Sequence, residues 1–159
     1  MSETSGGDVS IRRASLQCPA AERLINALND ELSDEYPEPG ATHFSLDAHE
    51  VEEGHGAFLI AYCDGDPIGC GAVRLLDHYT AEIKRMYVVP EARGKGVGAR
   101  ILAALEMECR RLGAYRLQLE TGERQGQAMA LYARAGFVRI PPFGEYINSP
   151  LSVCMEKKL

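Results

Sequence analysis

The chain has 159 residues, the length of one globular domain, since domains commonly hold about 100–200 residues. Hydrophobic residues make up 45% and charged residues 25%, as in ordinary chains that bury a single core. The 17 basic and 23 acidic side chains give a formal net charge of -6. Because a general nucleic-acid binder needs a basic surface to displace counterions from phosphates, this balance disfavours nucleic acid as a partner.

The chain shows no pattern for export, membrane insertion or metal binding. Residues 1–7 are polar and glycine-rich, unlike a signal peptide, and predict a flexible tail before one domain over 8–159. No apolar run approaches the roughly 18 residues of a membrane span. The five cysteines form no CxxC pair and the four histidines no HExxH pattern. We therefore expect a soluble, cytoplasmic protein with reduced thiols, no metal ion and no membrane partner.

Hydrophobic periodicity and turn residues divide the chain into strands and helices. The expected elements, in chain order, are a strand at 9–11, a helix from Pro19, one short helix near 47–53, strands at 57–63, 68–76 and 80–88, a helix at 98–112, a strand at 115–119, a helix at 128–135, and strands at 137–140 and 151–156. Tight turns imply antiparallel pairs, whereas a helix between two strands implies a parallel crossover. The expected order is β-α-βββ-α-β-α-β-β, in an α/β fold whose mixed sheet is flanked by helices.

The strand at 80–88 changes its apolar phase. Ala81 and Ile83 share one parity, whereas Met86 and Val88 share the other. A β-bulge between Ile83 and Met86 explains the change by inserting one residue. A strand that is buried on both faces explains it equally well, because it needs no alternation.

The segment Arg93-Gly-Lys-Gly-Val-Gly98 lies between a predicted strand and a predicted helix. Glycines allow a tight turn that brings backbone N–H groups to the helix N-terminus, where negative charge is stabilised. Arg93 and Lys95 add cationic donors. The segment is typical of a diphosphate cradle; the alternative is a solvated turn with incidental basic residues.

Known phosphate-binding patterns differ in the residues around such a loop. A P-loop is excluded, because Lys95 precedes a glycine and Val89 stands where its first glycine is required. The residues from Gly94 to Ala99 match the dinucleotide pattern GxGxxG/A, and Glu120 ends the following strand. The preceding strands are predicted to be hairpin-linked, however, which disfavours a dinucleotide fold.

Two ordered segments resemble landmarks of the GCN5-related N-acetyltransferases (GNAT). Arg93-x-x-Gly96-x-Gly98 resembles the pyrophosphate signature Q/R-x-x-G-x-G/A, and Leu131-Tyr-Ala-Arg-Ala-Gly-Phe137 resembles the LYxxxGF segment. The resemblance covers roughly residues 55–140. It implies a GNAT-like acyl-CoA N-acyltransferase fold, with acetyl-CoA as co-substrate. The implied reaction is direct acetyl transfer to a primary amine of a small molecule, peptide or protein in a ternary complex.

The resemblance also implies which residues contact acetyl-CoA. Backbone groups of Met86, Tyr87 and Val88 are expected to pair with pantetheine, and the Val88 N–H to polarise the thioester carbonyl. The expected pyrophosphate loop consists of Arg93, Gly94, Lys95, Gly96, Val97, Gly98 and Ala99. Gln125, where many relatives have Asn, is expected to hydrogen-bond pantetheine, and Tyr132 is expected to contact the cofactor.

Roles in catalysis follow from the same resemblance. Tyr132 occupies the general-acid position, and a phenol with a reference pKa of ~10 is protonated at neutral pH; its alternative role is to complete the apolar stripe of its helix. Glu82 is the expected base, acting through water, unless it is a surface carboxylate paired with Lys84 or Arg85.

The acceptor side is the least determined part of the sequence. Glu145 and Tyr146 are expected to line the substrate pocket, with ordinary loop packing as the alternative. A homodimer is compatible with the family. Two other functions stay open: a non-catalytic acyl-CoA-binding or regulatory module, and an interaction protein whose glycine loop is only a turn.

Overall fold

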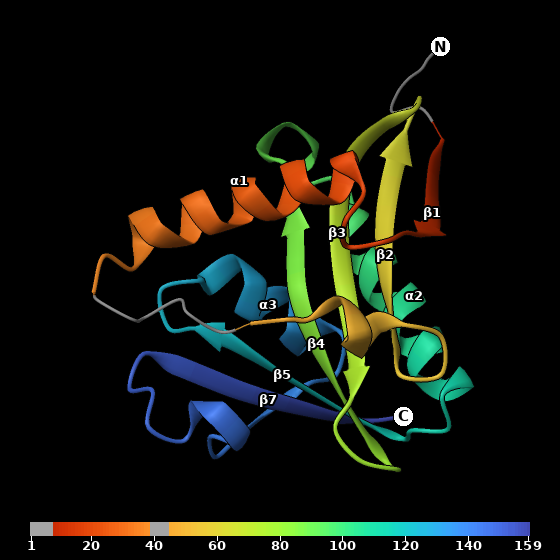
Figure 1. Cartoon of the computed structure of the whole chain (residues 1–159). Coiled ribbons are helices and arrows are strands. Elements are labelled where there is room, and N and C mark those ends of the chain that lie inside the picture. Colours follow the sequence, from red (N-terminus) through yellow and green to blue (C-terminus); the bar gives the residue numbers. More distant parts are fainter. Residues whose placement is uncertain (1–7, 39–44) are drawn as a thin grey trace.

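The computed structural model describes residues 8–38 and 45–159 (Figure 1). Seven strands form one sheet in the order β1-β2-β3-β4-β5-β7-β6, with β4 and β5 parallel and the other neighbours antiparallel. The strands are β1 (Val9–Arg13), β2 (Gly56–Cys63), β3 (Asp66–Leu75), β4 (Thr80–Val88), β5 (Arg116–Gly122), β6 (Val138–Ile140) and β7 (Ser152–Lys158). The helices are α1 (Pro19–Glu35), α2 (Val97–Arg111) and α3 (Gly126–Arg134), with 3₁₀ turns η1 (Ala48–Val51), η2 (Pro90–Ala92) and η3 (Gly144–Tyr146). The predicted order and the mixed α/β fold are confirmed, whereas the predicted tail at 1–7 lies outside the described residues.

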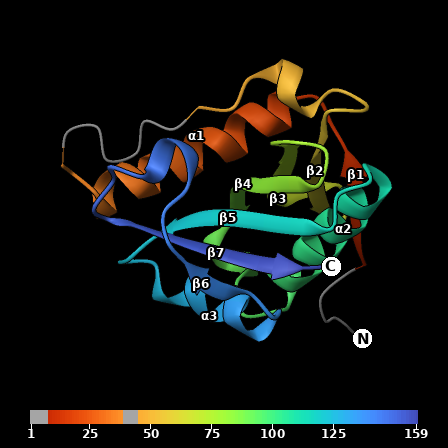
Figure 2. The same cartoon turned by 90° about the horizontal axis from the view of Figure 1, so that it is seen from below.

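Helices cover both faces of the sheet. α1 packs through Leu24 and Leu28 into one buried cluster, which includes Phe58 of β2. α2 and α3 belong to the opposite cluster, where Leu105 packs with residues such as Leu59 of β2. Figure 2 shows α1 on one side of the sheet and α3 on the other. Because β2 and β3 are buried on both faces, their sequences are continuous apolar runs.

The predicted hairpin at 64–67 is present but shorter. Asp64 and Gly65 both have positive φ, 51° and 85°, as a two-residue type I′ turn requires. Asp66 and Pro67 pair with β2 and belong to β3, so the predicted turn was two residues too long.

A β-bulge interrupts β4, as one of the two interpretations of its sequence predicted. Cys70 of β3 pairs with Tyr87, whereas Ala72 pairs with Lys84, so β4 carries one residue more than β3 across this interval. Arg85 lies in the bulge with φ of 60°, in the left-handed region. The other interpretation also holds in part, because Thr80 to Lys84 are all buried.

The strands β4 and β5 separate at the bulge. They pair only from Thr80 to Ile83 on β4 and from Arg116 to Leu119 on β5. Past this point each strand continues beside another neighbour, β4 beside β3 and β5 beside β7. Figure 1 shows the two strands diverging. The backbone of β4 beyond Ile83 therefore faces an opening instead of a β5 partner.

Candidate active site

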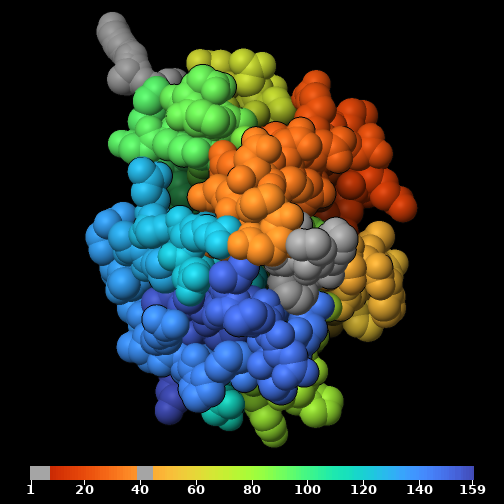
Figure 3. All heavy atoms as spheres, turned by 90° about the vertical axis from the view of Figure 1, so that its left-hand side faces the viewer, coloured from red at the N-terminus to blue at the C-terminus, as the bar shows by residue number. Residues whose placement is uncertain are grey.

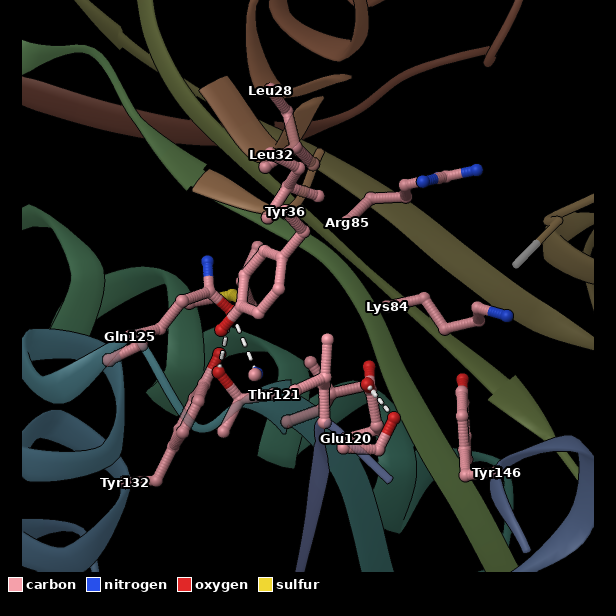
Figure 4. A pocket seen from close by; sticks show the side chains of 16 residues that line it. Leu28, Leu32, Tyr36, Lys84, Arg85, Glu120, Thr121, Gln125, Tyr132 and Tyr146 are labelled. Atoms are coloured by element: carbon pink, nitrogen blue, oxygen red, sulfur yellow. Dashed lines mark hydrogen bonds between the residues drawn. The ribbon is translucent and has the colours of Figure 1, made fainter. Parts of the chain in front are cut away.

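A cavity of about 120 Å³ lies at this opening. It is lined by the inner face of α1, by β4 around the bulge, by the end of β5, by α3, and by residues next to and within β7 and η3. Figure 4 shows that its polar side chains come from several of these elements. The separation of β4 and β5 thus creates the cavity, and the helices close it.

The glycine loop has the backbone of an anion cradle. Gly94 and Gly96 have φ of 77° and 81°, which glycine adopts without steric cost. Arg100 N–H bonds the Gly96 carbonyl at 3.1 Å, so the N–H groups at the preceding positions of α2 have no partner within the helix. A Cβ at Gly94 or Gly96 would meet no atom within 4 Å, so the loop is open on this side.

Other loop residues serve the fold as well. The Val97 side chain is buried in the core, and a Cβ on Gly98 would lie 3.2 Å from Leu131 of α3. Lys95 and Ala99 are exposed. The sequence-predicted loop is thus assembled at the start of α2, with its small residues allowing α2 and α3 to approach.

The Arg93 guanidinium turns back from the loop. Its Nε donates to the Val88 carbonyl at 2.8 Å, and Nη2 donates to Glu31 of α1 at 2.7 Å. It also lies over the Tyr87 ring, 5.6 Å from the centroid. Arg93 therefore ties α1 to the end of β4, while Met86 lines the cavity.

Tyr132 of α3 lines the cavity and is 5% exposed. Burial raises the pKa of its hydroxyl, and the nearby Glu120 carboxylate raises it further. Its ring packs edge-on against Phe137 with 5.8 Å between centroids. Within residues 8–38 and 45–159 the hydroxyl makes no hydrogen bond. The result is a protonated phenol held by packing and directed at the cavity, so Tyr132 both lines the site and completes its helix stripe.

Gln125 holds the turn between β5 and α3. Its side-chain oxygen accepts hydrogen bonds from Thr121 Oγ1 at 2.8 Å and from Gly122 N–H at 3.0 Å. Figure 4 shows Gln125 and Tyr132 on the same side of the cavity. Because the side-chain oxygen accepts these two bonds, the group that Gln125 can use toward a molecule in the cavity is its side-chain NH₂.

Glu82 is fully buried and does not line the cavity. Its Oε1 accepts from Arg74 Nη2 at 2.8 Å and Nε at 3.0 Å, and its Oε2 accepts from the Tyr146 hydroxyl at 2.5 Å. Arg74 is its direct cross-strand partner. The carboxylate is thus paired with Arg74, and Tyr146, which lines the cavity, is the link between Glu82 and the site.

Glu145 supports the same network from η3. Its Oε2 accepts from Lys84 Nζ at 3.1 Å and from Arg74 Nη2 at 3.3 Å. Glu50 also pairs with Arg74. Glu145 is not among the residues that line the cavity, whereas its neighbour Tyr146 is. The structure thus brings Tyr146, but not the Glu145 side chain, to the predicted acceptor side.

Glu120 of β5 is the site residue for which the sequence suggested a different role. It comes directly after Leu119, the last β5 residue paired with β4, and lines the cavity together with Tyr132. Ser152 Oγ donates to its Oε2 at 2.6 Å. Burial raises the pKa of Glu120, and this hydrogen bond opposes the rise. The available signal was a carboxylate at the end of the strand that follows the loop helix, which the sequence analysis counted only toward the dinucleotide pattern.

Hydrogen bonds and packing hold the C-terminal end of α1 against one side of the cavity. Tyr36 accepts a hydrogen bond from the Arg124 N–H at 2.7 Å, and Arg124 pairs with Glu38 at 2.6 Å. Tyr36 packs directly on Gly122, where a Cβ would lie 1.9 Å from the Tyr36 hydroxyl oxygen. In Figure 3 the orange end of α1 lies against the cyan and blue segments around α3. One wall of the cavity is therefore held by contacts between α1 and the β5–α3 turn.

Over residues 8–38 and 45–159, no group of three or more His, Cys, Asp or Glu side chains is placed to hold a metal ion. No helix in these two segments is long and apolar enough to cross a membrane. The five cysteines, all within these segments, form no disulfide with one another.

Comparisons with known proteins converge on one family. Residues 21–137 match the acetyltransferase (GNAT) family. An IAA acetyltransferase from Azospirillum brasilense is 39% identical over 153 residues, covering 96% of this chain and 99% of the relative. The uncharacterized N-acetyltransferase YjgM of Escherichia coli is 32% identical over 143 residues, covering 82% of each chain.

Solved structures share the fold. A Klebsiella pneumoniae protein assigned to the acyl-CoA N-acyltransferases has a TM-score of 0.83 and 33% identity, covering 95% of this chain and 97% of its own. The PaiA N-acetyltransferase of Thermoplasma acidophilum, in complex with coenzyme A, has a TM-score of 0.70 and 20% identity, covering 96% of this chain and 99% of its own.

Proposed function

Because the chain belongs to the GNAT acetyltransferase family and is an acetyl-CoA-dependent N-acetyltransferase, we propose that it transfers the acetyl group directly to a primary amine in a ternary complex. The observation that carries this proposal is the cavity between β4 and β5, which brings the Tyr132 phenol and the Glu120 carboxylate to one space. An acid and a base are the two groups that thioester aminolysis needs.

The chain has a fitting place for each part of acetyl-CoA. The N–H groups at the start of α2 and the open loop around Gly94 and Gly96 suit the pyrophosphate. Met86, Tyr87 and Val88 lie beyond the last β4–β5 pair, so the edge of β4 on which pantetheine is proposed to bind has no β5 partner there. The thioester supplies an activated acyl carbon. The Val88 N–H is the proposed donor to its carbonyl oxygen, on which negative charge develops during attack.

Tyr132 is the proposed general acid. Its hydroxyl is protonated at neutral pH because burial raises its pKa. Since the hydroxyl makes no hydrogen bond within the described segments, its proton is available to the departing sulfur. The phenol therefore holds a proton where the leaving group requires one.

Two carboxylates compete for the role of base. Glu120 lines the cavity, and its raised pKa gives it more affinity for a proton than an exposed carboxylate has. Glu82, the base predicted from the sequence, reaches the cavity only through the Tyr146 hydroxyl. The geometry favours Glu120 as the group that accepts the amine proton, with Glu82 as a positioning residue for Tyr146.

The size of the cavity supports a small acceptor or a narrow peptide N-terminus. Its apolar wall includes Leu28, Leu32 and Leu151. A full-length relative carries the name IAA acetyltransferase, which supports acetyl transfer as the reaction. The cytoplasmic location and the homodimer expected from the sequence stay predictions.

Two-substrate kinetics test the proposal. Release of free thiol from acetyl-CoA is followed over a panel of amines, with both substrates varied and the product identified by mass. Direct transfer predicts intersecting double-reciprocal lines and one acetylated amine per thiol released. Parallel lines with an acetylated protein intermediate would contradict it, and saturable acetyl-CoA binding without thiol release from any amine would support the non-catalytic module.

A further inference from the structure

The turn that leads from η3 into β7 brings one hydroxyl group to each of the two carboxylates that compete for the role of base. The Tyr146 hydroxyl donates to Glu82 at 2.5 Å. The Ser152 hydroxyl donates to Glu120 at 2.6 Å. Backbone bonds fix the turn, because Ser149 N–H donates to the Tyr146 carbonyl at 3.0 Å and Ser152 N–H donates to the Ser149 carbonyl at 3.1 Å. The Ser152 hydroxyl is therefore held at a defined place against Glu120.

The two carboxylates differ in their charged partners. Glu82 forms an ion pair with Arg74 at 2.8 Å. Within residues 8–38 and 45–159, Glu120 forms no ion pair, and Ser152 makes the only hydrogen bond to its side chain. Burial without a paired cation favours the neutral form of a carboxyl group, whereas a hydrogen bond to the carboxylate favours the ionised form. Ser152 is thus the group in direct contact with Glu120 that stabilises its charge.

A second serine sets the direction of the Ser152 hydroxyl. The Oγ atoms of Ser152 and Ser149 lie 2.7 Å apart. A serine hydroxyl has one proton to donate and accepts through its lone pairs. Because a hydrogen bond to a carboxylate is stronger than one to a hydroxyl, the Ser152 proton goes to Glu120 and the Ser149 hydroxyl donates to Ser152. The dashed line beside Glu120 in Figure 4 marks the inner bond of this chain, which ends at the cavity.

Other titratable groups around Glu120 act on its charge without a hydrogen bond. Burial is the largest influence on the pKa of Glu120 and raises it, and the Ser152 hydrogen bond is the largest influence that lowers it. Glu82 and Glu145 raise this pKa by smaller amounts, and Lys84 lowers it. The uncharged titratable groups that feel the Glu120 charge are Tyr36, Tyr132, Tyr146 and Cys154. Removal of the Ser152 hydroxyl therefore takes away the main support of the ionised carboxylate.

We propose that Ser152 is a positioning residue for the reaction: its hydroxyl holds Glu120 ionised and aligned to accept the amine proton, and Ser149 fixes the direction of that hydroxyl. This inference rests on the proposed function, because it concerns the base of the same site. As the acceptor nitrogen bonds to the thioester carbon, one proton passes from this nitrogen to Glu120. The carbon–sulfur bond breaks, and the departing sulfur takes the Tyr132 proton. Ser152 exchanges no proton with the substrates.

The pH dependence of a single variant tests this role. Ser152→Ala removes the donor, so Glu120 should stay protonated to a higher pH. The measured quantity is the ratio of wild-type to variant kcat/KM at each pH, in which the ionisation of the acceptor cancels. The ratio should be about 10 or more at low pH, as expected when a hydrogen bond to a charged group is lost, and should fall as Glu120 ionises in both proteins. A merely structural role predicts one constant ratio at every pH, and that result would overturn the proposal.

Four further variants separate this effect from folding. Ser152→Thr keeps the hydroxyl and should keep the wild-type profile, and Ser10→Ala, at an exposed position of β1, should give a ratio of about 1 throughout. Ser149→Ala leaves the inner bond in place and should give a smaller rise at low pH; where Ser152→Ala does not fold, the absence of any rise in Ser149→Ala refutes the proposal. In a Glu120→Gln background, Ser152→Ala should change kcat/KM by less than about 2-fold, because the carboxylate on which it acts is gone. An undiminished loss in that background would show that Ser152 acts elsewhere.

A titration that needs no turnover separates this inference from the function on which it rests. In protein labelled with carbon-13 at the glutamate carboxyl groups, the Glu120 resonance is the one that is missing in Glu120→Gln. Its NMR titration midpoint should lie at higher pH in Ser152→Ala than in wild type or in Ser152→Thr. If no amine releases thiol although acetyl-CoA binds, the proposed function fails, and the upward shift still supports the role of Ser152. Equal midpoints would overturn that role even in an active enzyme.

Discussion

Replacing Tyr132 by phenylalanine isolates the proposed general acid. The change removes one hydroxyl and keeps the ring, whose edge-on contact with Phe137 has a centroid distance of 5.8 Å. Because the hydroxyl makes no hydrogen bond within residues 8–38 and 45–159, no partner is left unsatisfied there. The free energy of unfolding should therefore change by less than about 1 kcal/mol.

The effect on catalysis should be much larger. A positioned general acid contributes about 10²–10⁴-fold, or about 3–5 kcal/mol of the barrier, so kcat should fall by at least about 100-fold. Acetyl-CoA affinity should stay close to wild type, because pantetheine and pyrophosphate contacts are elsewhere. Thiol release at saturating substrates, calorimetry with acetyl-CoA and a thermal melt measure the three quantities. A folded variant with wild-type kcat and affinity would refute the role of Tyr132.

Three further substitutions test the remaining parts of the site. Glu120→Gln should lower kcat/KM by about 100-fold or more, and wild-type kcat/KM should fall on acidification through the raised pKa of Glu120. The folded-state pKa of Glu120 is raised, so its contribution to stability is fully present below its unfolded pKa and is lost as pH rises through the folded value. Glu120→Gln should therefore melt at a higher temperature than wild type near about pH 8, and the difference should vanish near about pH 4. A lower melting temperature at both pH values would contradict this. Glu82→Gln should reduce the free energy of unfolding by about 1–3 kcal/mol and affect kcat less than Glu120→Gln does, and the reverse ranking of kcat would make Glu82 the base. Gly96→Leu should abolish acetyl-CoA binding in calorimetry. Gly65→Leu, in the β2–β3 turn, has a similar positive φ and equally open surroundings, so it should lose comparable stability but still bind. Equal binding by both variants would contradict the assignment of the glycine loop to the cofactor site.

Local patterns in the sequence were sufficient for most of the fold. Alternation and helical stripes identified each strand and helix of the predicted order, because the longer elements bury a regular apolar face. Gly113 and Gly136 follow the ends of α2 and α3 with φ of 87° and 101°, as helix-ending glycines do. Only the boundaries moved by a few residues, since capping and hairpin register depend on neighbours that periodicity does not encode.

The bulge shows where local information ended. The phase change between Ile83 and Met86 is compatible with a β-bulge or with burial on both faces, and the pairing of β4 with β3 shows that a bulge is present. Pairing register is a property of two strands, so one strand's sequence does not specify it. The strain at Arg85 and the separation of β4 from β5 follow from that register.

The site depends mostly on contacts between distant residues. Tyr132 was found through a local motif, whereas the Tyr146–Glu82 hydrogen bond joins residues 64 positions apart. Glu120 lines the cavity because β5 continues past Leu119, the last residue that pairs with β4. The packing of Tyr36 on Gly122 is equally non-local. None of these contacts has a sequence periodicity, so they required the assembled fold.

Calorimetric titration with acetyl-CoA, with NAD as the comparison ligand, tests the central claim most directly. The glycine loop and the opening between β4 and β5 predict saturable one-site binding of acetyl-CoA and no binding of NAD. Well-folded protein that binds NAD instead, or that binds neither ligand, would contradict the assignment of this opening as the acetyl-CoA site.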